Sequence, residues 1–175
     1  MKISRMILVV APCLGTTAQA GTVHECDRLA ASPDDPDRPR GIAGIEREKI
    51  DVGAATAACD RAVAEFPEIG RFHFQQARVL WAQGELDLAL AVVEKAVAFG
   101  HGHARRLARD LHGLALFYAE ENSEERKRSL EFFRLEALKG DAFAQYALVG
   151  FGLALSGQDR QNQTEETLKP GSVYA

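Results

Sequence analysis

Three histidines lie close together in the sequence and are the first candidates for metal ligation: His101, His103 and His112. If a helix begins near His101, residue 112 lies about 16 Å along it, at ~1.5 Å per residue. A single zinc ion holds its ligands at about 2 Å and cannot bridge that distance. His101 and His103, separated by one glycine, are typical of a turn. We therefore predict no metal site and no cofactor.

Three aspartates set among prolines, Asp34, Asp35 and Asp37, are the other potential ligands. They lack the full spacing, the central glycine and the closing glutamate of an EF-hand calcium loop. We therefore expect a solvated loop at this position.

No nucleophile lies in a recognisable catalytic motif. The sequence has no Gly-x-Ser-x-Gly, and Gly150-Phe-Gly152 is not followed by the Lys-Ser/Thr of a phosphate loop. His73 lies in a segment that is apolar nearly all round, which favours a packed core histidine over a ligand or a base. We predict no catalytic residues, and a protein that is not an enzyme.

The first twenty residues are typical of a signal peptide. Lys2 and Arg5 precede a short apolar run, and Ala18-Gln-Ala20 is the small-x-small pattern of a cleavage site. A lipoprotein anchored at Cys13 is the alternative, which Pro12 disfavours. We therefore expect cleavage after Ala20 and a periplasmic or secreted product.

Cleavage leaves two of the three cysteines, Cys26 and Cys59. In an oxidising compartment the simplest expectation is a disulfide between them. Closing a loop of that length would stabilise the fold by roughly 3–4 kcal/mol in the chain-entropy model. The alternatives are two buried free thiols or a redox pair, although no Cys-x-x-Cys motif supports the latter.

The formal charge argues against nucleic acid as a partner. The whole chain carries −4, and cleavage after Ala20 removes two basic residues and no acidic one, which leaves −6. Binding to phosphates needs clustered lysine and arginine. Arg105-Arg106 and Arg126-Lys-Arg128 are local and are flanked by acidic residues, so we expect solvated helix faces there.

Helical periodicity covers the chain from Asp51 to Gly157 and predicts an all-α protein. Apolar residues recur at three- and four-residue steps on both sides of Gly84, which predicts two antiparallel helices joined by a very short turn. Asp51, Ser123 and Asp141 are the expected N-caps of further helices. Residues 21–50 hold three prolines within residues 32–41 and predict an extended arm, whereas residues 158–175 predict a disordered polar tail.

The ends of three expected helices align. Their anchors, Ala62, Ala96 and Ala137, are separated by 34 and 41 residues. A period near 34 residues is that of tetratricopeptide repeats, and the chain resembles an exported bacterial tetratricopeptide/Sel1-like repeat protein over residues 51–157. His73 and His101 depart from that pattern, standing where such repeats often have Trp and Pro. The resemblance implies an α/α superhelix, a short right-handed solenoid of antiparallel helix pairs with a concave face.

That concave face is the expected binding surface for another protein or a peptide. Basic and amide side chains there would suit an acidic or C-terminal peptide, with no nucleic acid and no membrane involved after signal cleavage. The candidate residues lie on the first helix of each pair: Arg71, Gln75, Arg78, Gln83, Arg105, Arg109 and Gln145. The alternative is a periplasmic enzyme on a Sel1-like scaffold, acting as a cell-wall or peptide hydrolase or as a thiol redox protein.

Overall fold

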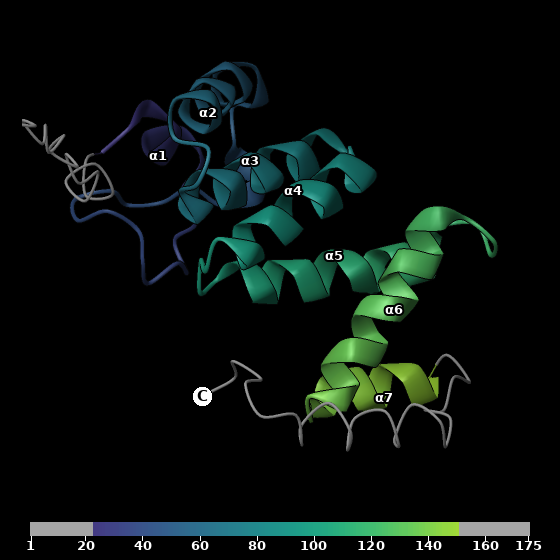
Figure 1. Cartoon of the computed structure of the whole chain (residues 1–175). Helices are drawn as coiled ribbons and strands as arrows, with labels where there is room; N and C mark the ends of the chain where they lie inside the picture. Colours follow the sequence, from purple (N-terminus) through teal and green to yellow (C-terminus); the bar gives the residue numbers. More distant parts are fainter. Residues whose placement is uncertain (1–22, 151–175) are drawn as a thin grey trace, which may run out of the picture.

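The computed structural model describes residues 23–150, and all regular structure in this range is helical (Figure 1). The all-α prediction is therefore confirmed over the described residues, which contain no strand. The elements are, in chain order, α1 (Glu25–Ala30), the 3-10 helix η2 (Arg47–Lys49), α2 (Val52–Glu65), α3 (Gly70–Gln83), α4 (Leu86–Ala98), α5 (Ala104–Tyr118), α6 (Glu124–Leu138) and α7 (Ala142–Gly150).

Local capping residues set the ends of these helices. The Asp51 carboxylate accepts a hydrogen bond from the Ala54 N–H at 3.2 Å, and the Ser123 hydroxyl accepts one from the Arg126 N–H at 3.2 Å. Each bond satisfies an amide that the first helical turn leaves unpaired. Gly84 ends α3 with a φ of 85°, a left-handed conformation that glycine adopts without steric cost. The predicted short connection between α3 and α4 is confirmed.

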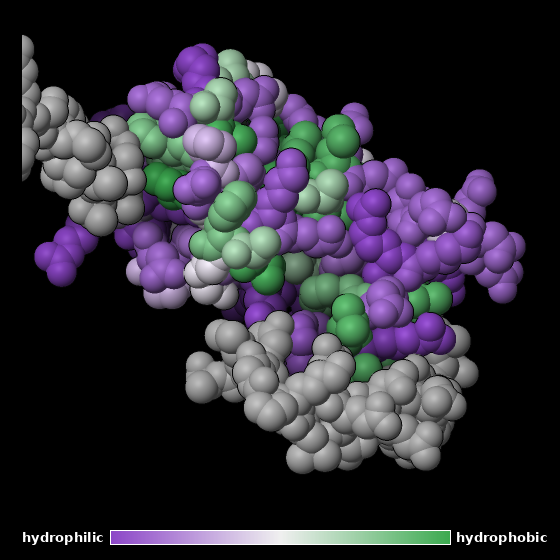
Figure 2. Space-filling model, in the orientation of Figure 1, coloured by the Kyte–Doolittle hydropathy of each residue, from purple (hydrophilic) through white to green (hydrophobic). Residues whose placement is uncertain are grey.

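The helices pack mainly on their neighbours in the chain. In Figure 1, α3, α4 and α5 lie side by side, α6 runs across the end of α5, and α7 packs against α6. Alanines such as Ala55, Ala58 and Ala62 on α2 are almost completely buried, which allows close approach between helices. Most of the face visible in Figure 2 is polar, with apolar side chains showing in small groups between polar ones.

The N-terminal arm is not extended throughout, contrary to the prediction for residues 21–50. Residues 25–30 form α1, which begins with a capping box: His24 Nδ1 accepts from the Cys26 N–H, and the Asp27 carboxylate accepts from the His24 N–H at 2.7 Å. The three prolines come after this helix. They prevent regular structure only in the loop between α1 and η2. Arg38 organises that loop by donating to the carbonyls of Ser32, Pro33, Asp35 and Ile42.

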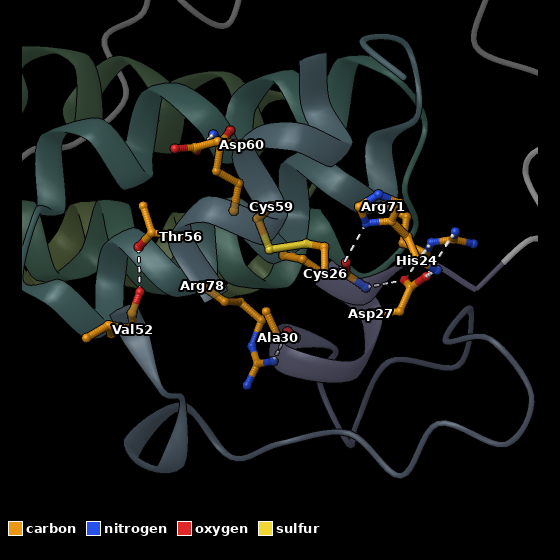
Figure 3. Close-up of a disulfide and its surroundings, with 12 residues drawn as sticks. His24, Cys26, Asp27, Ala30, Val52, Thr56, Cys59, Asp60, Arg71 and Arg78 are labelled. Atoms are coloured by element: carbon orange, nitrogen blue, oxygen red, sulfur yellow. Dashed lines mark hydrogen bonds and ion pairs between the residues drawn. A yellow bond between two sulfur atoms is a disulfide. The ribbon is translucent and has the colours of Figure 1, made fainter. Parts of the chain in front are cut away.

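A disulfide joins Cys26 of α1 to Cys59 of α2, and both residues are completely buried (Figure 3). It closes a 33-residue separation and holds the arm against the helical body. Cys59 lies on the alanine-rich face of α2, so its partner is on the buried side of that helix.

The expected signal peptide and polar tail lie outside the described residues, as does Gly157, the expected end of the last helix. Within residues 23–150 no helix combines the length and the apolar character needed to cross a membrane.

Candidate functional site

Three of the expected groove residues on α3 are already bound to the arm. Asp27 is completely buried. Its Oδ1 lies 2.9 Å from Arg71 Nε, and it also accepts a hydrogen bond of 2.8 Å from the Gln75 side-chain amide. Arg78 donates to the carbonyl oxygens of Ala30 and, at 2.6 Å, of Ile45. Figure 3 shows Arg71 and Arg78 reaching α1 beside the disulfide.

The expectation that Arg71, Gln75 and Arg78 line an open groove is therefore corrected. The three side chains share one face of α3, as their spacing requires, but all are buried, and Gln75 has no exposed surface. Burial also lowers the pKa of the Arg78 guanidinium, against the opposing charges of carboxylates such as Glu46. The polar face of α3 thus holds an acidic segment of the same chain.

Two other expected residues are exposed and hydrogen-bonded locally. The Gln83 amide donates to the Thr56 hydroxyl at 2.7 Å, and the Gln145 amide donates to the Ala137 carbonyl at 3.1 Å. The first bond ties α3 to α2, and the second ties α7 to the end of α6. Both side chains remain accessible to a partner.

The last two expected residues, Arg105 and Arg109, lie together in a cleft between α5 and the α6–α7 pair. We call it the arginine cleft; its volume is about 140 Å³, and it is lined by Arg105, Arg106, Arg109, Phe132, Phe133, Glu136, Asp141 and Ala144. Arg105 pairs with Glu136 at 3.3 Å while its side chain stays 57% exposed, and Arg109 faces Asp141 at 3.8 Å. Both contacts are weak enough in water for an incoming carboxylate to exchange with them.

Arg106 is the residue that the sequence analysis missed. It is exposed, and within residues 23–150 no ion pair is found for it. It lines the arginine cleft and also a second cleft of about 200 Å³, between the arm and α3 and α5, where Trp81 and Asp110 are among the lining residues. The only sequence pattern that indicates this placement is its position three residues before Arg109, because residues three apart are neighbours on a helix surface.

A hydroxyl, an imidazole and a carboxylate meet at the interface of α4, α5 and α6. His112 Nδ1 lies 3.0 Å from Ser129 Oγ, and His112 Nε2 lies 3.3 Å from Glu94 Oε1. The order hydroxyl, imidazole, carboxylate is that of a nucleophilic triad, but the two ring nitrogens are interchanged relative to the Ser-His-Asp arrangement. However, His112 and Ser129 have no exposed surface, neither lines a cleft described above, and the His112 ring is stacked on Phe132 at 4.1 Å.

The pKa of His112 is that of a buried structural group. Burial, together with the smaller effect of the Arg128 charge, lowers it to about 4, so the imidazole is neutral at pH 7. Burial also raises the pKa of Glu94. A neutral imidazole can accept a proton, but in this conformation no substrate can reach the Ser129 hydroxyl.

The acidic loop and the histidine turn meet in space. Asp35 and Asp37 come from the arm, and His101 comes from the turn between α4 and α5. One ligand atom from each lies within 4.8 Å of the other two. Their separation along the chain hides this proximity from sequence reasoning.

The resemblance to tetratricopeptide/Sel1-like repeats rests on the aligned helix ends at Ala62, Ala96 and Ala137 and on their spacing. The all-helical fold agrees with the resemblance but does not single it out. No protein-family model, no curated protein and no solved structure matches this chain.

Proposed function

We propose that this chain is an exported, non-catalytic helical-repeat protein that binds another protein or a peptide. Helices α2 to α7 would form a short right-handed solenoid of the tetratricopeptide/Sel1-like kind. The observation that carries the proposal is the arginine cleft, where three arginines of α5 stand beside two phenylalanines. With Arg71, Gln75 and Arg78 covered by the arm, this cleft holds the accessible arginines among the residues expected to bind a partner.

The chemistry of the cleft favours an acidic ligand with an apolar neighbour. Guanidinium groups bind carboxylates through two parallel hydrogen bonds. Arg106 has no competing ion pair within the described residues, and Arg105 and Arg109 hold theirs at a partly exposed surface. Phe132, which is only partly buried, would pack against an apolar side chain of the ligand. An acidic peptide segment or a C-terminal carboxylate fits both features.

The test is crosslinking of the tagged protein in cells, followed by affinity purification and quantitative mass spectrometry. We expect one dominant co-purifying protein with the parent chain. Arg105→Glu with Arg106→Glu should remove it, because both guanidinium groups face the cleft. Arg61→Glu is the matched control, since Arg61 is an exposed residue of α2 outside both clefts. Equal recovery of the partner with the double variant would refute the assignment to this cleft.

The alternative function, a hydrolase, has one observation in its favour, the Ser129–His112–Glu94 trio. Its burial is the argument against it, because a serine nucleophile must contact the substrate carbonyl. A fluorophosphonate reagent tests this directly, with the Ser129→Ala variant as control. We expect no labelling of the parent chain; labelling that Ser129→Ala abolishes would overturn the non-catalytic proposal.

A further inference from the structure

We propose that Asp35, Asp37 and His101 form a binding site for one divalent transition-metal ion, with zinc as the reference ligand. The three side chains come from two segments that the fold brings together, the loop after α1 and the turn after α4. One imidazole nitrogen and two carboxylate oxygens are a ligand set that zinc accepts. The solvent-exposed side at Asp37 leaves a position for water.

The buried pair in this cluster has the spacing of two ligands of one metal ion. His101 Nε2 and Asp35 Oδ2 lie 3.2 Å apart, and both side chains are at least nine-tenths buried. Neither atom makes a hydrogen bond of good geometry within the described residues, and each is the nearest charged partner of the other. Ligand atoms of a tetrahedral zinc ion, each about 2.0–2.2 Å from the metal, are also about 3.3 Å apart, with their lone pairs aimed at a third point.

Local structure holds these two ligands in place. Asp35 Oδ1 accepts a hydrogen bond from the Asp37 N–H at 3.0 Å, which leaves Oδ2 as the free carboxylate oxygen. The His101 N–H donates to the Ala96 carbonyl at the end of α4, and the His101 ring packs on Phe74 at 4.7 Å. A site whose ligands are positioned before binding loses less entropy when the ion arrives.

Charge also favours a divalent ion here. Asp35 and Asp37 bring two carboxylates to one imidazole, and charge in a buried position is costly unless it is compensated. A protonated His101 would offset one of the two negative charges, whereas a divalent cation offsets both. The ion would fasten the arm loop to the α4–α5 turn, whereas the Cys26–Cys59 disulfide fastens α1 to α2.

The test is isothermal titration of the metal-stripped full chain, without a histidine tag, with ZnCl₂, followed by Co²⁺ titration read by visible absorption. We expect one zinc per chain, a Co²⁺ spectrum of four- or five-coordinate type and a higher melting temperature with zinc. Asp37→Asn should weaken binding by at least about tenfold, since loss of a ligand costs no less than loss of an outer-shell partner. Asp37 is exposed, so this variant keeps the fold.

His101→Asn should lower the affinity further, and Asp34→Asn is the matched control because Asp34 is outside the cluster. Circular dichroism verifies that each variant is folded. Absence of binding at 100-fold excess of zinc, or equal affinity for the parent chain, Asp37→Asn and His101→Asn, would overturn the proposal.

Discussion

His112 should make the stability of the protein strongly dependent on pH. In the unfolded chain a histidine has a pKa near 6.5, whereas burial lowers the pKa of His112 in the fold to about 4. Between these values the unfolded state binds the proton and the folded state does not. The free energy of unfolding therefore falls as the pH falls through this window.

The size of the effect follows from the difference of about 2.5 pKa units. At ~1.36 kcal/mol per unit, the cost below pH 4 is about 3 kcal/mol, most of it incurred between pH 6.5 and pH 4. Such a loss is a large fraction of the stability of an ordinary domain. Other groups titrate in the same range, so the contribution of His112 has to be isolated by a variant.

The assay is urea unfolding of the parent chain and of His112→Gln at pH 7.5, 6.0, 5.0 and 4.2. Glutamine keeps a hydrogen-bonding group near Ser129 but does not titrate. We expect the parent chain to lose about 2–3 kcal/mol more than the variant between pH 7.5 and pH 4.2. Identical pH profiles would refute the reasoning. If the variant does not fold, the pKa of His112 can be measured by NMR titration of the parent chain. A titration midpoint near 6.5 would contradict a buried neutral imidazole.

Three further changes test the packing of the arm and of α5. Cys59→Ser should lower the free energy of unfolding by about 3–4 kcal/mol, because the disulfide closes a 33-residue separation; a melting temperature equal to that of the parent would exclude this role. Asp27→Asn should cost about 1–3 kcal/mol in urea unfolding, because it removes the buried carboxylate that pairs with Arg71 and accepts from the Gln75 amide, whereas the exposed Glu25→Gln control should cost less than about 0.5 kcal/mol. Gly113→Ala should raise the free energy of unfolding by about 0.5–1 kcal/mol, because Gly113 is within α5 with open space around its Cα; destabilisation would contradict that environment.

Helix boundaries in this chain could be predicted because the signals for them are local. Asp51, Ser123 and Asp141 each cap a helix through a bond to an amide three residues away, and Gly84 adopts its left-handed conformation within its own turn. Such interactions depend on neighbours in the sequence and little on the rest of the fold.

The short helix α1 was missed for the opposite reason. Six residues are too few for a stable isolated helix, because nucleation costs more than so few hydrogen bonds return. Its disulfide to Cys59 and the contacts of Asp27 with Arg71 and Gln75 stabilise it, and these join residues more than thirty positions apart. No local sequence pattern before the prolines indicates these long-range contacts.

The sequence alone therefore determined the helical class, the capping residues and the sharing of one α3 face by Arg71, Gln75 and Arg78, since periodicity and capping act over a few residues. Only the tertiary structure decided what covers that face and which distant groups meet. The arm buries the three side chains, and the turn after α4 brings His101 within 3.2 Å of Asp35. These outcomes depend on contacts between segments far apart in the chain. Bringing such segments together costs conformational entropy, which burial of side chains and the disulfide offset.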